Sequence, residues 1–144
     1  MTYPAHVILR YRIERALIEG DMKLADLPSA WNEMMQKLLG IVPEDDRNGC
    51  MQDIHWPAGA WGYFPTYTLG AMAAAQIFAA AREANPEIPD ALSRGDFAPL
   101  MRWLGKNIHG QASSKSTDAI LEAATGKALG VDAFRAHLEN RYGQ

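Results

Sequence analysis

The chain has few of the features that would anchor it in a membrane, crosslink it or attach it to nucleic acid. Its single cysteine, Cys50, excludes an internal disulfide and is typical of a reducing compartment. No basic run is present and the net charge is −3, so nucleic acid is a poor candidate partner. The longest apolar run, Leu69 to Ala75, is too short for a membrane span. Charges from Arg10 onward exclude a secretory signal, and we expect a cytoplasmic protein.

The sequence also lacks the histidine spacing of a self-contained zinc site. The four histidines are His6, His55, His109 and His137, and no two of them are three or four residues apart. A helical zinc site needs that spacing, because side chains one turn apart lie on the same face of the helix. There is no Cys-x-x-Cys pair either. We therefore expect this chain to bind no metal by itself.

What the sequence does contain is typical of an all-α protein. Apolar residues make up 48% and charged residues 22% of the 144 residues, as in a soluble globular domain. Apolar periodicity, Gly and Pro predict a single-domain helical bundle, residues 1–144, of about five to six helices. The alanine- and glycine-rich third helix is slender and is predicted to be central. The expected helices cover residues 3–19, 26–39, 65–84, 96–110, 116–126 and 131–142.

One long connection, residues 41–65, is expected to be functional rather than merely a linker. It contains Gly49 to Trp56 and leads into Gly62 to Gly70, which together hold an acid, an imidazole, an amide, tyrosines and tryptophans. Long loops in compact domains are usually functional or disordered, and this one is too aromatic for disorder. Converging polar groups surrounded by aromatic rings are what a binding cleft requires.

The residues Gly49-x-x-Gln52-Asp53-x-His55-Trp56 resemble the G-x-x-Q-D-x-H-W motif of the carboxypeptidase Taq family of zinc metallocarboxypeptidases. The similarity extends over nearly the whole chain, in the same order along the sequence. Further matching segments are Thr2-Tyr3, His6 to Tyr11, Asp26-Leu27-Pro28, Ala30-Trp31-Asn32, Leu39-Gly40, Asn107-Ile108-His109 and Ala124-Thr125-Gly126. What matches is the C-terminal end of a much longer enzyme.

This resemblance implies a function in which one part of the complete enzyme binds the metal and another part binds the substrate. The family holds zinc with a His-Glu-x-x-His helix and a later Glu, and this chain has no such helix. The resemblance therefore implies the substrate-cleft portion of an enzyme that removes C-terminal amino acids from peptides. Zinc or cobalt would belong to the complete enzyme, peptide C-termini would be the ligands, and the chain alone is expected to be inactive.

The alternative is a non-catalytic helical module, derived from that family, for binding or oligomerisation. Without the missing N-terminal helices, the apolar faces of the first and third helices would be exposed. Such exposure predicts a homodimer or a complementary N-terminal chain.

The motif residues allow two interpretations of their own. If residues 52–56 are extended, Asp53 and His55 point to one side while Gln52 and Trp56 point to the other. The acid would then orient the imidazole for proton transfer or hydrogen bonding to a reacting carbonyl. Alternatively, Asp53 caps a helix or ties the loop to Arg10, and His55 only bonds to the backbone.

The family resemblance favours the catalytic interpretation of these residues. It implies that Asp53 and His55 lie in the cleft beside the zinc, and that Tyr63 or Tyr67 donates a hydrogen bond to the substrate or to the tetrahedral intermediate. We therefore predict two groups of site residues. The catalytic group is Asp53, His55, Tyr63 and Tyr67, and the substrate-binding group is Gln52, Trp56, Arg10 and His6.

The first helix carries an unusual polar row on its buried side. His6, Arg10 and Glu14 are four residues apart, so they lie along one face, opposite the exposed Arg12 and Arg15. Buried charges need partners. In one interpretation Arg10 and Glu14 pair with each other and His6 is a satisfied core residue. In the other, the row faces the cleft formed by the glycine-rich loop.

Overall fold

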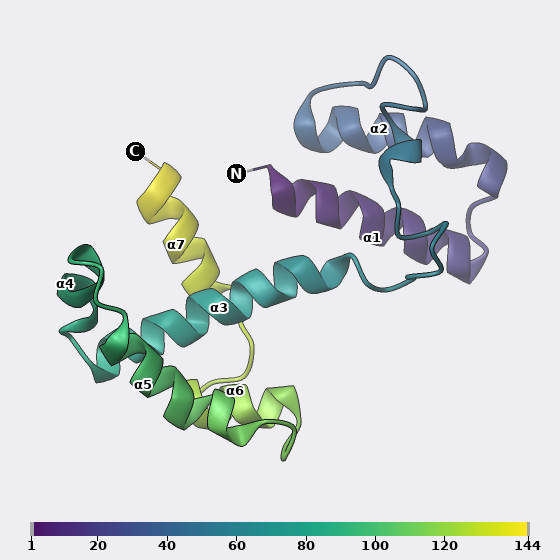
Figure 1. The fold of residues 1–144 in the computed structure, drawn as a ribbon. Helices are drawn as coiled ribbons and strands as arrows, with labels where there is room; N and C mark the ends of the chain where they lie inside the picture. Colours follow the sequence, from purple (N-terminus) through teal and green to yellow (C-terminus); the bar gives the residue numbers. More distant parts are fainter. Residues whose placement is uncertain (1, 144) are drawn as a thin grey trace. The chain divides into compact units, whose positions relative to one another are not determined.

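A computed structural model describes residues 2–143, and within this range it contains helices and loops but no strand (Figure 1). Seven α-helices follow one another along the described chain, together with three short 3₁₀ helices. The α-helices are α1 (Tyr3–Glu19), α2 (Leu27–Leu39), α3 (Pro65–Ala84), α4 (Ile88–Ser93), α5 (Ala98–Asn107), α6 (Thr117–Thr125) and α7 (Asp132–Tyr142). The 3₁₀ helices are η1 (Leu24–Asp26), η2 (Cys50–Gln52) and η3 (His109–Gln111). The all-α prediction is confirmed.

The first three helices have the bounds that the sequence predicts. α1 and α2 each end at a glycine in the left-handed conformation, Gly20 with φ 80° and Gly40 with φ 74°. Only glycine adopts this conformation without a steric cost, so it terminates the helix. Pro28 occupies the first turn of α2, where its missing N–H has no helical partner to lose. Local sequence therefore determines these ends.

The described residues form seven α-helices, one more than the upper end of the five to six expected for the chain, and the additional helix lies in the second half. The six-residue α4 is too short to show a helical period in sequence, and it buries Ile88 and Ala91. α5 begins two residues after the predicted start, because Asp96 Oδ1 accepts a hydrogen bond of 2.9 Å from the backbone N–H of Ala98. The predicted Ser116 cap of α6 is confirmed by its hydrogen bond from the Ala119 N–H.

By its internal contacts the chain divides into two compact units, with the boundary between Leu69 and Gly70 inside α3. In the first unit α1 packs against α2. The core of this unit consists of Leu9, Ile13, Trp31, Met35 and Cys50. In the second unit α5 contacts α4, η3 and α6. The largest side chain that is fully buried there is Ile88.

The slender helix α3 is not enclosed in this chain. Of its 20 residues only Gln76 and Ala81 are buried, and its small side chains leave the remaining surface partly or fully exposed. The prediction of a central helix is therefore not met within residues 2–143. The physical reason is that small side chains allow other helices to approach closely, but they do not themselves bring another helix to that position.

Candidate functional site

The motif forms a tight turn rather than an extended segment. After η2, Asp53 Oδ1 accepts hydrogen bonds from the backbone N–H groups of His55 (2.8 Å) and Trp56 (3.1 Å). Asp side chains commonly bond to the backbone in this manner and so close a turn. The extended interpretation, in which Asp53 and His55 point to the same side of a strand, is therefore wrong. Glycine is favoured at position 49, just before the turn, because the Cβ of any other residue would lie 3.1 Å from the Asp45 carbonyl oxygen.

A buried ion pair ties the turn to α1. Arg10 Nε lies 2.8 Å from Asp53 Oδ2, and the two side chains are 10% and 0% exposed. The guanidinium carbon is 4.6 Å from the ring centroid of Trp31 and 4.5 Å from that of Phe64, within range of cation–π attraction. Burial lowers the pKa of Arg10 and Asp53 raises it, and a guanidinium stays charged in proteins. The interpretation in which Asp53 ties the loop to Arg10 is confirmed.

Glu14 makes a second connection between α1 and the loop. Its Oε2 accepts a hydrogen bond of 2.8 Å from Trp56 Nε1, and its Oε1 accepts one from the Gly62 N–H. Gly62 has φ +76°, a conformation that other residues rarely adopt. Arg10 and Glu14 therefore each bond to the loop. The interpretation in which Arg10 and Glu14 pair with each other is wrong. Of the row that the other interpretation directs toward a cleft at the glycine-rich loop, Arg10 and Glu14 contact the loop.

His55 lies in a cluster of aromatic rings. Its imidazole stacks on Tyr63, with centroids 5.6 Å apart and planes at 20°, and meets the edge of Phe64 at 5.0 Å. Nε2 lies 3.4 Å from the Tyr67 hydroxyl. Nδ1 is buried and has no hydrogen-bond partner among the described residues, since its 3.8 Å from Asp53 Oδ1 is too long. Asp53 thus holds His55 through its backbone, not its ring.

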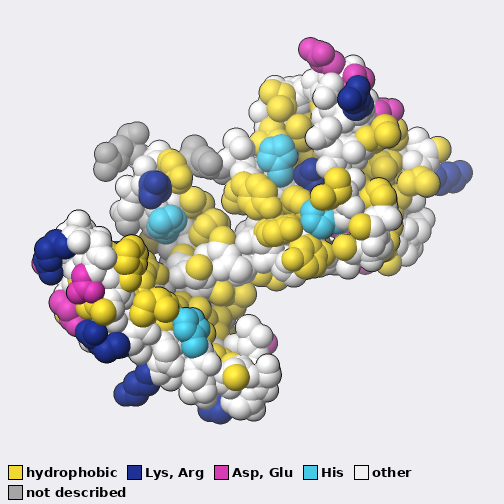
Figure 2. Space-filling view, viewed as in Figure 1, with side chains coloured by type: hydrophobic (Ala, Val, Ile, Leu, Met, Phe, Trp, Pro, Cys, Tyr) yellow, Lys and Arg dark blue, Asp and Glu magenta, His cyan; other side chains and the backbone are white. Residues whose placement is uncertain are grey.

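The two tyrosines of this cluster reach the surface. Tyr63 is 51% and Tyr67 41% exposed. Figure 2 shows one face of the first unit on which hydrophobic side chains gather with histidines among them. Desolvation, and next the nearby Tyr63, raise the pKa of Tyr67. Tyr67 therefore stays a neutral phenol at physiological pH and can donate a hydrogen bond. The cluster can offer an imidazole and a phenol to a ligand side by side.

The remaining predicted site residues have other partners. Gln52 is exposed and its amide donates a hydrogen bond of 2.6 Å to the Arg47 carbonyl oxygen. The half-buried Trp56 stacks with Trp61, with centroids 6.0 Å apart and planes at 16°. His6 is half-buried and contributes its backbone oxygen, which accepts a hydrogen bond of 3.2 Å from Arg10.

The predicted site residues did not include three residues that shape this region. Glu14 was placed on the polar row of α1, but its bonds to Trp56 and Gly62 could not be foreseen from helical spacing. Phe64 closes one face of the Arg10 guanidinium and Trp61 extends the Trp56 stack. Both lie in a loop without periodicity, so only the aromatic content of the loop could have indicated them.

The described residues offer no metal site and no membrane span. No three His, Cys, Asp or Glu side chains between residues 2 and 143 gather closely enough to hold an ion. Asp53, the most buried acid of the motif, already has both oxygens engaged by Arg10 and the backbone. In the part of the chain that the structure describes, no helix combines the length and the apolarity needed to cross a bilayer.

Comparisons with known proteins agree with the family resemblance that the motif indicates. A family model described as carboxypeptidase Taq (M32) metallopeptidase matches residues 1–142. The chain is 42% identical over 142 residues to Carboxypeptidase 1 of Bacillus subtilis (strain 168), covering 99% of this chain and 28% of that protein. The solved structure of Trypanosoma cruzi metallocarboxypeptidase 1 superposes with a TM-score of 0.93 at 43% identity, covering 99% of this chain and 30% of the other.

A third relative gives the same picture. The crystal structure of the M32 carboxypeptidase from Deinococcus radiodurans R1 superposes with a TM-score of 0.96 at 35% identity, covering 99% of this chain and 29% of that one. The chain therefore belongs to the carboxypeptidase Taq (M32) metallopeptidase family. It spans less than a third of the length of these relatives.

Proposed function

We propose that this chain forms one wall of the substrate cleft of a carboxypeptidase, an enzyme that hydrolyses the C-terminal peptide bond. The observation that carries the proposal is the motif turn. It is bonded to α1 through Arg10 and Glu14 and presents His55 beside two exposed tyrosines. A rigid turn that carries an imidazole and a phenol suits the binding of a peptide carbonyl or carboxylate.

The motif turn and the residues around it take different roles in this proposal. His55, Tyr63 and Tyr67 would contact the C-terminal part of a peptide, with Tyr67 donating a hydrogen bond from its protonated hydroxyl. Asp53 and Arg10 are buried and pair with each other, so they act as positioning residues. Asp53 fixes where the imidazole lies by bonding to the backbone N–H of His55. The stacked Tyr63 ring limits rotation of that imidazole.

The family description names a metallopeptidase, yet the described residues do not fit a metal site. In the proposal, zinc or cobalt is therefore held by another part of the enzyme, and this chain alone is inactive. The metal, when bound there, would supply the polarisation of the scissile carbonyl. The contribution of this chain is to bind and orient the peptide next to it.

The test is a peptidase assay in two steps. The chain with zinc or cobalt is first incubated with peptides that carry a free C-terminus, and no release of amino acids is expected. It is then mixed with Bacillus subtilis Carboxypeptidase 1 from which the matching 142 residues are removed. Release of C-terminal amino acids by the mixture supports the proposal. Release by the chain alone with metal contradicts it.

A matched pair of variants shows whether the motif residues act. His55→Ala is expected to lower kcat/KM of the active mixture by about 10²-fold or more, the size typical for removing a polar group that contacts the reacting centre. Ile54→Ala is the control, because this neighbour is 73% exposed and lies outside the aromatic cluster. Equal activity of the two variants would show that the imidazole does not contact the substrate.

A second candidate is a non-catalytic module that associates through α1. The outer face of α1 exposes Ile8 (42%), Tyr11 (47%) and Ile18 (65%) in addition to its charges. Exposed apolar residues on one helix face indicate a contact surface for another chain. This candidate predicts a homodimer, measurable by sedimentation at several concentrations. Ile8→Glu should weaken the dimer, whereas Glu33→Ala on the exposed face of α2 should not.

A further inference from the structure

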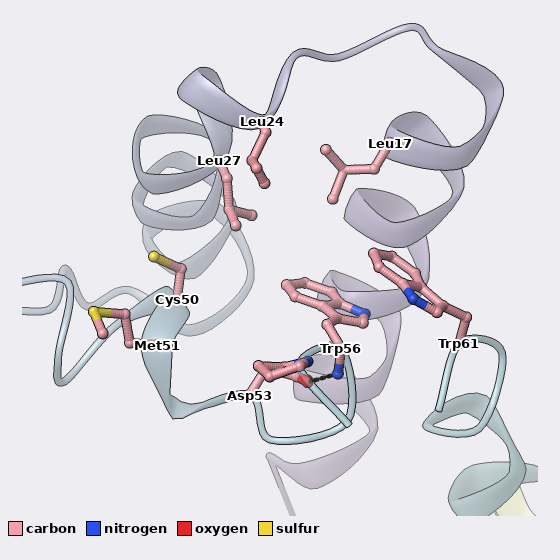
Figure 3. A pocket seen from close by; sticks show the side chains of 9 residues that line it. Leu17, Leu24, Leu27, Cys50, Met51, Asp53, Trp56 and Trp61 are labelled. Carbon is pink, nitrogen blue, oxygen red and sulfur yellow. Dashed lines mark hydrogen bonds between the residues drawn. The ribbon is translucent and has the colours of Figure 1, made fainter. Parts of the chain in front are cut away.

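The first unit contains an open-sided cavity of about 280 Å³ that the proposed function does not use. Figure 3 shows Leu17, Leu24 and Leu27 facing the indole rings of Trp56 and Trp61 across this space, with Cys50 and Met51 at one side. Asp53 and Pro57 complete its lining. The cavity is formed by α1, η1, α2, η2 and the motif turn.

The charged group of this lining and the Trp56 indole N–H are already hydrogen-bonded within the chain. Asp53 is the only charged residue that lines it, and its oxygens are bonded to Arg10 and to two backbone N–H groups. The Trp56 N–H is donated to Glu14. A charged ligand would lose its hydration here without gaining a partner, which is costly. The walls therefore favour an uncharged ligand.

Size and shape narrow the ligand further. A cavity of roughly 150 Å³ lined by apolar side chains binds benzene, so about 280 Å³ has room for two fused rings. The indoles of Trp56 and Trp61 lie at only 16° to each other with centroids 6.0 Å apart, so the pair presents a flat ring surface against which a planar ligand can stack. At the rim, Leu24 is 72% and Met51 70% exposed, so a ligand would remove apolar surface from water.

We propose that this cavity is a binding site for a small, uncharged aromatic molecule of two fused rings, stacked on Trp56 and Trp61 beneath the three leucines. The site does not depend on the peptidase proposal. It is complete within the first unit, and its ligand contacts neither His55 nor the two tyrosines of the aromatic cluster.

The test uses the 144-residue chain and indole as the probe. In an NMR titration, indole is expected to shift the methyl signals of Leu17, Leu24 and Leu27 in a saturable manner, with a Kd near or below about 1 mM. Indole-3-carboxylate has the same rings and adds a negative charge, so its Kd should be at least about tenfold higher. No saturable shift up to about 10 mM indole, or equal affinity for both molecules, overturns the proposal.

Two variants test the location of the site. Trp61→Ala removes one of the two rings of this flat surface and should raise the Kd for indole at least about fivefold, a loss typical of removing an aromatic stacking partner. Phe97→Ala is the matched control, because this ring is also exposed (60%) but belongs to the second unit. Circular dichroism verifies that both variants fold. Unchanged affinity in a folded Trp61→Ala variant, or a weaker affinity in Phe97→Ala, contradicts the assignment.

Discussion

Two charged residues one turn apart on α1, Arg10 and Glu14, determine where the motif turn lies. Leaving a buried charge unpaired costs several kcal/mol of folding free energy, so burial of each of these side chains requires that its partners are in place. Arg10 has the carboxylate of Asp53 together with the Trp31 and Phe64 rings, and Glu14 has two N–H donors from the loop. At the residue scale, the position of the loop follows from satisfying these charges.

Replacing Arg10 is expected to be severe. Arg10→Ala leaves the fully buried Asp53 carboxylate without its cation, and we expect the free energy of unfolding to fall by about 3 kcal/mol or more. Chemical denaturation followed by circular dichroism measures this change. Arg15→Ala on the same helix is the control, because the exposed Arg15–Glu19 pair should contribute little although its N–O distance is 2.7 Å. Equal losses in the two variants would contradict the argument.

His6 makes stability depend on pH. Burial, and next the positive charge of Arg10, lower the pKa of His6 below its usual 6.5. The unfolded chain therefore binds a proton at His6 at a higher pH than the folded chain does. The stability due to neutral His6 is complete above pH 6.5 and is lost as the pH falls below that value toward the folded pKa.

The measurement compares urea midpoints at about pH 7.5 and about pH 5. His6→Gln should lose less stability than the unaltered chain over this interval, because it has no imidazole to protonate. His137→Gln, at an exposed position on α7, should keep the pH dependence of the unaltered chain. A His6→Gln variant with the same pH dependence would show that other groups cause it.

At the scale of elements, Gln76 connects α3 to the segment between α6 and α7. Its Nε2 donates hydrogen bonds to Thr125 Oγ1 (2.9 Å), the Lys127 oxygen (3.0 Å) and the Ala128 oxygen (3.1 Å), and its Oε1 accepts one from the Gly130 N–H (3.0 Å). The side chain is buried. The Gln76 amide thus supplies hydrogen bonds to a connecting segment that has no regular secondary structure of its own.

Removing this amide should loosen that connection. Gln76→Ala removes all four hydrogen bonds of this buried amide, and we expect the free energy of unfolding to fall by about 2 kcal/mol or more. Amide hydrogen exchange should show faster exchange of Gly130. Gln36→Ala, on the exposed side of α2, is the control and should leave both quantities unchanged. Normal protection of Gly130 in the Gln76 variant would mean that the segment is held by other contacts.

At the scale of the whole molecule, the chain consists of two groups of residues that mainly contact members of their own group, and the boundary between the groups lies within α3. Arg10 and its partners belong to the first group, and Gln76 and its partners to the second. Such groups can open separately, as cooperative units of native proteins do.

The two destabilising variants should therefore act in different regions. In hydrogen exchange, Arg10→Ala is expected to lower the protection of amides in α1 and α2 more than in α5 and α6. Gln76→Ala should have the opposite pattern. Mass spectrometry of peptide fragments distinguishes the two regions. Uniform loss of protection in both variants would show that the chain unfolds as one cooperative body.

Local sequence was sufficient for most helices and for the family. Helix ends follow from Gly20, Gly40 and the Ser116 cap, because capping depends on neighbours in the chain. The short α4 could not be predicted, since six residues show no helical period. The motif was visible because its residues are contiguous, but its conformation was not, since an Asp that bonds to the backbone and one that points along a strand have the same sequence.

The sequence by itself determined that the chain is helical, that α1 buries charge and that one loop carries the polar and aromatic groups. Only the tertiary structure decided that Arg10 pairs with Asp53 rather than Glu14, and that Tyr67 and not Asp53 lies within reach of the His55 ring. The reason is physical. Composition and periodicity report which side chains must leave water, whereas the choice of partner depends on distances between segments about 40 residues apart.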